Sequence, residues 1–207
     1  MGEVALHIEF LVEEYSAQIV LESILPKMLS ADTSFAVRSF RGKPDLLKNL
    51  PSRLRGYKYT LDYRVVVLVD RDDDDCRDLK SKLEAISKEC GIVTKSIALA
   101  NQSFQVLNRI AIEELEAWFF GDVDALVAAY PGVPVSLANK AKYRDPDAIT
   151  GGTAEALEKV LQRAGYHRGR LEKVKAARDI SLHMNPALNR SRSFQVFCEG
   201  LSCIKAV

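Results

Sequence analysis

The feature that most constrains the fold is a run of five apolar residues, Val65-Val66-Val67-Leu68-Val69, followed at once by Asp70. An apolar run without alternation is typical of a strand that is covered on both faces, as in a parallel sheet. Apolar and alternating patterns predict further strands at residues 4–12, 35–40 and 92–100, and the ambiguous segment 104–112 favours a strand.

The segments between these strands have helical patterns. We expect helices at residues 16–29, shortened by Pro26, at 45–54, interrupted by Pro51, and at 79–90, ending at Gly91. The alternation of strands and helices predicts an α/β fold, with a mostly parallel central sheet flanked by helices and joined by right-handed crossovers. In such sheets, ligands bind beyond the carboxyl ends of the strands, so functional residues are expected there.

Strand signals fade after residue 112. Helices are expected at residues 113–120, 122–130, 153–164 with Thr153 as N-cap, 170–182 and 186–201. We therefore expect an α/β core over residues 1–112 and a C-terminal helical annex over residues 113–207. A chain of 207 residues can form one core with such an annex packed on it as a compact unit.

Composition and cysteine usage narrow the class of protein. The chain is 47% hydrophobic and 28% charged, an ordinary globular balance. No window approaches the roughly 18 apolar residues of a membrane span, and the start Met1-Gly2-Glu3-Val4 lacks the pattern of a signal peptide. The four cysteines form no C-x-x-C pair, so we expect a cytoplasmic chain with reduced cysteines and no cysteine-based zinc site.

The formal net charge is only +1, but the charges are unevenly distributed. Residues 1–132 hold 16 Lys+Arg and 21 Asp+Glu, whereas residues 133–207 hold 13 and 7. One interpretation is a metal site beside a phosphate-contacting surface. The other is a chance difference between solvated helices.

Acidic residues follow two of the predicted strands. Glu13 ends the first, and Asp70 and Asp72 form a D-x-D pair at the end of the strongest. Residues two apart in an extended segment point to the same side, so both carboxylates can face one point. Mg²⁺ suits such a pair, because it takes oxygen ligands and relieves the repulsion between the carboxylates. The alternative for the aspartates is a solvated acidic turn.

A second acidic group is Glu113 with Glu116, three residues apart and hence on one face of the predicted helix, with Glu114 pointing elsewhere. These two glutamates are candidates for a further metal ligand or for an orienting partner of a basic residue. The alternative is a solvated face opposite the buried side chains of Leu115 and Trp118.

Other catalytic signatures are missing from the sequence. His7 lies inside a predicted strand and is expected to be structural, while His167 lies in a basic loop that could contact phosphates. The histidines are not spaced for a zinc triad, and there is no P-loop, dinucleotide-binding glycine motif or nucleophile elbow.

The acidic motifs resemble the Toprim catalytic domain of topoisomerases, primases and overcoming-lysogenization-defect-type nucleases. More closely, they resemble a small Toprim-like bacterial family of unassigned function whose members often neighbour ABC-type ATPases. The resemblance spans nearly the whole chain and is carried by Asp70-Arg71-Asp72, Asp75-Cys76, Leu79-Lys80, Ile112 to Phe119, Tyr143-Arg144-Asp145-Pro146 and Ser191-Arg192-Ser193-Phe194.

The resemblance implies a Toprim-like fold, Mg²⁺ or Mn²⁺ held by Asp70 and Asp72, and an acid–base or metal-binding role for Glu13. Glu113 and Glu116 match the second acidic motif of the family. The chain departs from the family after its first glutamate, where Gly and then Thr-Glu are usual. Here Glu14-Tyr15-Ser16-Ala17 follows, and Ala17 offers no carboxylate.

These observations favour a Mg²⁺-dependent phosphodiester-cleaving enzyme, a nuclease that could be a bacterial defence effector with an ABC-type ATPase partner. Basic residues of the second half would contact the nucleic-acid backbone, namely Lys140, Lys142, Arg144, Arg168 and Arg170. The first alternative is a non-catalytic, metal-binding Toprim-like module that binds an ATPase partner, and the second is phosphoryl transfer on a small molecule. The substrate and the oligomeric state stay open.

Overall fold

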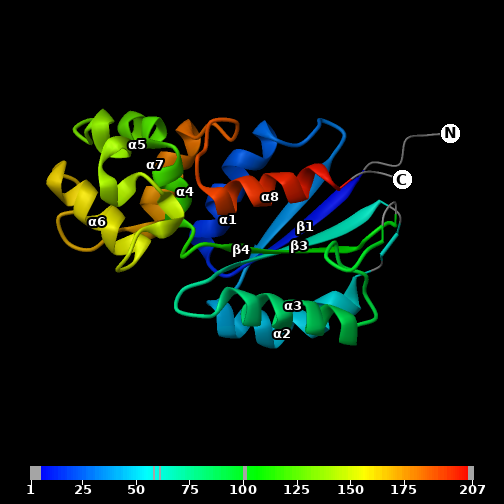
Figure 1. Ribbon diagram of the computed structural model, residues 1–207. Helices are drawn as coiled ribbons and strands as arrows, with labels where there is room; N and C mark the ends of the chain where they lie inside the picture. The colour runs from blue at the N-terminus through cyan, green and yellow to red at the C-terminus, as the bar shows by residue number, and fades with distance from the viewer. Residues whose placement is uncertain (1–5, 58, 61, 100–101, 205–207) are drawn as a thin grey trace.

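The structure is a computed structural model that describes residues 6–57, 59–60, 62–99 and 102–204. Within these ranges, four parallel strands form one sheet in the order β2-β1-β3-β4 (Figure 1). The strands are β1 (His7–Val12), β2 (Ser34–Ser39), β3 (Tyr63–Asp70) and β4 (Val106–Ala111). The α-helices are α1 (Tyr15–Ile24), α2 (Lys43–Gly56), α3 (Cys76–Glu89), α4 (Glu116–Gly121), α5 (Val123–Ala129), α6 (Thr153–Arg163), α7 (Lys173–His183) and α8 (Arg192–Ser202).

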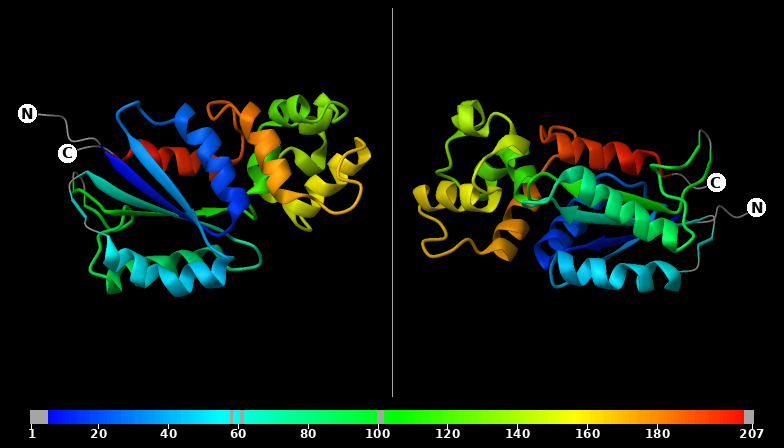
Figure 2. Two further views of the ribbon diagram at one scale, coloured as in Figure 1. Left: turned by 180° about the vertical axis from the view of Figure 1, so that it is seen from behind. Right: turned by 60° about the horizontal axis from the view of Figure 1, so that its bottom comes forward.

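The helices cover the sheet on both faces and at one end. α2 and α3 lie on one face, α1 and α8 lie on the other, and α4 to α7 gather beyond the carboxyl ends of the strands (Figures 1 and 2). The predicted α/β class, with a parallel sheet, flanking helices and a helical annex, is confirmed. No helix in the described ranges is long and apolar enough to cross a membrane.

The apolar run of β3 explains the two covered faces. Val65, Val67 and Val69 belong to a core cluster with the leucines of α2 and α3, whereas Val66 and Leu68 belong to a second cluster on the opposite face. Successive side chains of a strand point to opposite faces, so a continuous apolar run fills two cores at once.

The second cluster also joins the sheet to the annex. It contains Phe10 of β1, Trp118 of α4 and Phe197 of α8, with ring centroids of Phe10 and Phe197 6.4 Å apart and those of Trp118 and Phe197 5.2 Å apart. Helix α8 therefore returns from the annex to the face of the sheet, and a single apolar cluster spans both parts.

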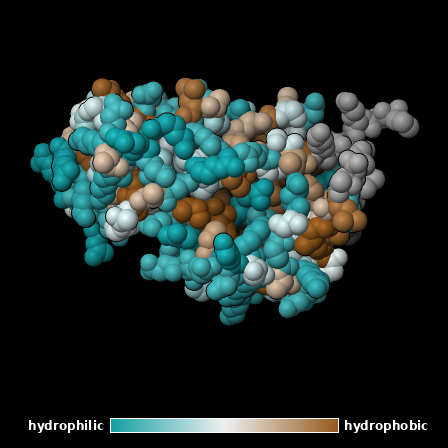
Figure 3. Space-filling view, viewed as in Figure 1, coloured by the Kyte–Doolittle hydropathy of each residue, from teal (hydrophilic) through white to brown (hydrophobic). Residues whose placement is uncertain are grey.

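Two expectations for the first half of the chain were wrong. The strand predicted at residues 92–100 is not formed in its described part, 92–99, where a single bridge pairs Thr94 with Val106 and turns follow; residue 100 lies outside the described residues. Ile97 and Leu99 of this loop are exposed, 53% and 76% accessible. Hydrophobic side chains gather at the right-hand end of the molecule in Figure 3, the end at which this loop lies in Figure 1. Pro51 does not interrupt α2, which runs through it for 14 residues because three leucines anchor one face.

Helix boundaries account for the other differences. Pro26 shortens its helix as predicted, because the α-helix ends at Ile24 and a 3-10 turn follows. The N-cap of α6 is Gly152 and not Thr153, and the helix expected from residue 186 begins only at Arg192, capped by the Ser191 side chain. The helix expected from residue 113 begins at Glu116, which changes the site described below.

Gly121 allows α4 to contact the segment before α8. A Cβ atom there would overlap the Asn189 side chain and lie 2.9 Å from the Ser191 backbone nitrogen. Asn189 is buried and cannot swing away without losing its bond to the carbonyl of Trp118, 2.8 Å long. We expect Gly121→Ala to destabilise the protein by about 1–3 kcal/mol, the usual range for an overpacked core.

Thermal unfolding measures this effect, and Gly56→Ala in α2 is the matched control because no atom lies within 4 Å of its added Cβ. The control should leave the melting temperature unchanged or raise it slightly, since alanine is the better helix former. Equal melting temperatures for the two variants would show that Gly121 is not needed for packing.

Candidate metal centre

The carboxyl ends of β1 and β3 are adjacent. Val12 pairs with Leu68 in the sheet, so Glu13 is level with Val69 and Asp70 follows one residue later. The Asp70 backbone N–H donates to Oε2 of Glu13 at 2.6 Å, which fixes the Glu13 side chain across the end of the sheet. Glu13 is buried, with 7% of its surface exposed.

Glu116 enters the same site from the first turn of α4 and is buried at 3% exposure. Burial raises the pKa of Asp70 well above its ordinary value, and repulsion from Glu116 and Glu13 raises it further. Burial likewise raises the pKa of Glu13 to about 7 and that of Glu116 to about 7. Three carboxyl groups therefore share a poorly solvated region in which their negative charges repel one another.

Lys173, the first residue of α7, supplies positive charge to this region. Its Nζ lies 3.6 Å from Glu116, 3.7 Å from Glu114 and 4.0 Å from Glu14. Burial acts to lower the pKa of Lys173, but these carboxylates and Asp70 outweigh it and raise the pKa. Sequence reasoning missed Lys173; the one available signal was a lysine in a helical first turn, where the macrodipole disfavours it.

Asp72 does not share the geometry expected for the D-x-D pair. The strand ends at Asp70, and Asp72 has a left-handed backbone with φ of 49°. Its carboxylate lies 2.8 Å from Nζ of Lys43, which also contacts Asp74 at 2.7 Å and donates to the carbonyl of Arg71 at 3.1 Å. The extended conformation predicted for this segment was wrong, although the charge of Asp72 still raises the pKa of both Asp70 and Glu13.

Glu113 and Glu116 do not lie on one helical face, because Glu113 precedes α4. Glu113 contacts Arg71 at 2.7 Å, and its carbonyl accepts from the Asp72 backbone N–H at 2.8 Å, so it holds the aspartate loop. Glu114 was expected to point elsewhere, but it reaches Lys173 and accepts from the Thr153 hydroxyl at 2.9 Å at the start of α6.

The donors of the site suit a hard divalent cation. Asp70, Glu13 and Glu116 offer carboxylate oxygens on three elements, and a cation would relieve the burial and repulsion that raise their pKa values. Within the ranges that the structure describes, no three Asp, Glu, His or Cys side chains already converge as a ligand set. The ammonium group of Lys43 contacts Asp72, and that of Lys173 contacts Glu116.

The basic residues singled out in the sequence are exposed on the annex. They are Lys140, Lys142, Arg144, Arg168 and Arg170. The loop that carries the last two runs along the outer side of the annex (Figures 1 and 2). His167 of this loop does not face solvent: 2% of its side chain is exposed, and Nε2 lies 3.0 Å from the Tyr130 hydroxyl. His7 lies in β1 with Nδ1 2.8 Å from the Ser34 hydroxyl.

Fold and site together define a parallel α/β protein with buried and partly buried carboxyl groups beside the carboxyl ends of its central strands. The chain belongs to the family described as a domain of unknown function (DUF4276), whose model matches residues 12–202 and so includes every acidic residue of the site. Among solved structures, it is similar to the C-terminal region of the Burkholderia pseudomallei OLD protein, at 16% identity and a TM-score of 0.45 over 93% of this chain and 97% of that one. No curated protein matches the chain.

The raised pKa values predict how stability depends on pH in the metal-free protein. Glu13 and Glu116 have an ordinary pKa of 4.5 and a pKa of about 7 in the folded state. Between these values the folded chain keeps protons that the unfolded chain has released. The two groups therefore make their full contribution to stability below pH 4.5. The free energy of unfolding then falls as the pH rises to about 7.

Melting temperatures in EDTA at several pH values between 4.5 and 8 measure this dependence. Glu116→Gln should flatten the decline, because glutamine carries no proton to lose, whereas Glu89→Gln at the exposed end of α3 should not. A decline of the same size in all three proteins would contradict the assigned burial of Glu116.

Removal of Lys173 should destabilise the protein most at high pH. Lys173→Met leaves Glu116, whose side chain is 4% exposed, without its ammonium partner. The cost is about 1 kcal/mol, the lower end of the range for an unpaired buried group, because solvent screens the 35% exposed Lys173 side chain. Lys175→Met on the same helix, where Lys175 pairs with Asp179 and is 54% exposed, is the control. Unfolding at pH 5 and pH 8 tests the assignment: equal destabilisation at both pH values would mean that Lys173 contributes packing alone.

Proposed function

We propose that this protein is a Mg²⁺- or Mn²⁺-dependent Toprim-like nuclease that cleaves phosphodiester bonds in the cytoplasm. The observation that carries the proposal is the proximity of three carboxyl groups: Asp70 at the end of β3, Glu13 just after β1 and Glu116 in the first turn of α4. Glu13 and Glu116 are buried, and Asp70 is partly buried. Carboxyl groups with strongly raised pKa values in one place are unfavourable for stability and are typical of functional sites.

Asp70, Asp72 and Glu13 would hold the metal, with Glu116 completing the acidic site. When bound, the cation would polarise the phosphoryl oxygen and neutralise developing negative charge. Asp72 would have to exchange its contact with Lys43 for the metal. Lys43 would then keep Asp74 as its partner, so the loop would remain tied to α2.

Glu13 is suited to proton transfer near neutral pH, because burial raises its pKa to about 7. As a general base, the alternative to its role as a ligand, Glu13 would accept the proton on Oε1, because the Asp70 backbone N–H donates to Oε2. Glu113 would act indirectly by holding Arg71 and the backbone of Asp72. The five basic residues of the annex would contact the nucleic-acid backbone, giving binding that weakens with salt.

The experiment compares wild type with Asp70→Asn/Asp72→Asn and with the exposed control Asp124→Asn of α5. Mg²⁺ and Mn²⁺ binding is measured by calorimetry, and cleavage of plasmid DNA, RNA and bis(4-nitrophenyl) phosphate is assayed on the same samples. We expect metal binding at least about tenfold weaker and cleavage lost in the double variant, with the control unchanged. Metal binding that is equal in all three proteins would contradict both the site and the nuclease proposal.

Two observations favour a non-catalytic role. Lys43 and Lys173 already neutralise part of the acidic cluster, and Ala17 stands where the resembled family carries a carboxylate. Metal binding without cleavage of any substrate in the same experiment would support a module that acts through a partner, for which an ABC-type ATPase is the candidate. Cleavage of the small phosphodiester alone would support small-molecule chemistry.

A further inference from the structure

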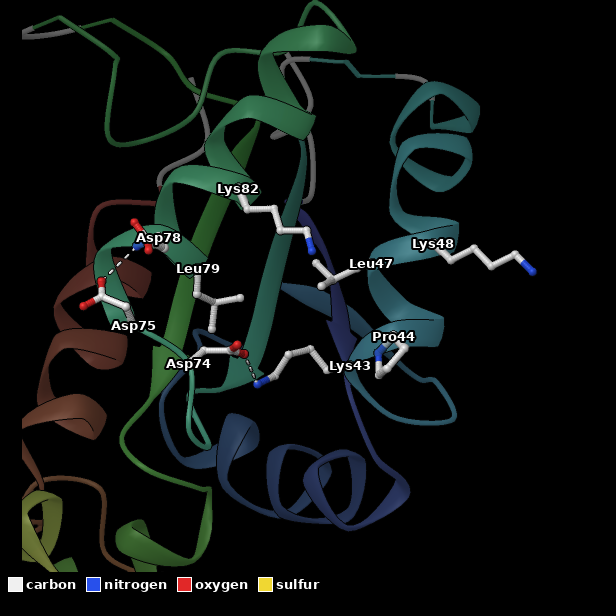
Figure 4. A pocket seen from close by; sticks show the side chains of 9 residues that line it. All are labelled: Lys43, Pro44, Leu47, Lys48, Asp74, Asp75, Asp78, Leu79 and Lys82. Atoms are coloured by element: carbon white, nitrogen blue, oxygen red, sulfur yellow. Dashed lines mark hydrogen bonds and ion pairs between the residues drawn. The ribbon is translucent and has the colours of Figure 1, made fainter.

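A groove of about 730 Å³ lies between the first turns of α2 and α3 (Figure 4). Three lysines line it: Lys43 and Lys48 from α2, and Lys82 from α3. Leu47 and Leu79 add apolar surface between the two helices. Lys82 extends across the groove toward Leu47, whereas Lys48 points away from it at the outer edge of α2 (Figure 4).

Three aspartates also line the groove, but two of them are already engaged. Asp74 pairs with Lys43 at 2.7 Å, and Asp75 caps α3 by accepting from the backbone N–H groups of Arg77 and Asp78. Lys48 and Lys82 have no carboxylate within 4.0 Å in the part of the chain that the structure describes. Lys82 helps to lower the pKa of Asp74, after the larger effect of Lys43, but forms no ion pair with it, so the ammonium groups of Lys48 and Lys82 remain available to a ligand.

The groove adjoins the candidate metal centre through Lys43. Its ammonium contacts Asp74 on the groove side and Asp72 on the side of the metal centre. A second cavity of about 560 Å³ lies against the same loop and is lined by Asp72, Glu113 and Glu114. The aspartate loop thus has a lysine-lined groove and an acidic cavity as neighbours.

We propose that this groove binds phosphate groups of a nucleic-acid strand that flank the phosphodiester held at the acidic site. The inference rests on the proposed function and names a substrate subsite for it. Lysine ammonium groups bind phosphates as point charges, and the apolar lining accepts sugar carbons. The acidic cavity repels phosphate unless a cation is bound there, whereas Lys48 and Lys82 attract it with or without metal.

The test uses Lys48→Ala/Lys82→Ala against Lys88→Ala/Lys159→Ala, which removes the same charge from exposed positions of α3 and α6. Binding of fluorescent 20-nucleotide DNA and RNA strands is followed by anisotropy in Ca²⁺ over a range of salt concentrations. We expect the groove variant to bind at least about tenfold more weakly and its salt slope to drop by about 1.4, the value for two lost single-strand contacts. Its Mg²⁺ affinity and melting temperature should match those of the control variant.

Groove and control variants with equal affinity and salt slope would overturn the subsite while leaving the proposed function intact. Wild type that neither binds nor cleaves either strand would overturn both. A polyglutamate peptide is the competing probe: loss of peptide binding in the groove variant with unchanged nucleic-acid binding would overturn the subsite and assign the groove to an acidic protein partner.

Discussion

Repulsion among buried carboxyl groups is the constraint on which the rest of this structure depends. The parallel order of β1 and β3 places Glu13 beside Asp70, and α4 adds Glu116. Water cannot screen these charges fully, so the fold must either keep protons on them or bring cations to them. Both solutions are present, because the carboxyl pKa values are raised and Lys173 approaches from the annex.

The sequence predicted the part of the site that depends on local patterns. The apolar run of residues 65–69 fixed the strand, and the end of a parallel strand fixed the position of Asp70. A parallel sheet allows Glu13 to lie near Asp70, and the strand order of the structure, with β1 beside β3, brings them together. The conformation of Asp72 did not follow, because beyond the strand the backbone depends on contacts with Lys43 and with the carbonyl of Glu113, both far away in the sequence.

The remaining errors have the same physical origin. Residues 92–99 have strand-like composition but form one bridge, since Thr94 and its neighbour Ser96 bond to the Glu84 side chain instead of extending the ladder. Lys173 was missed because its place in a helical first turn does not reveal partners that lie in α4, just before α4 and beside β1. Such contacts arise only when the annex packs on the end of the sheet.

Helix α7 connects the annex to the core of the protein at both of its ends. Lys27 donates to the carbonyls of Ser181, Leu182 and Met184 at 2.9–3.1 Å and so stabilises the carboxyl end of α7, where the macrodipole favours a cation. At the other end the macrodipole opposes Lys173, so only the carboxylates hold its ammonium in place. A divalent cation at Asp70 would draw on the same negative charge as Lys173. Under the proposed function, cation binding at Asp70 and the position of the first turn of α7 would therefore be coupled, so that a change at one would alter the free energy of the other.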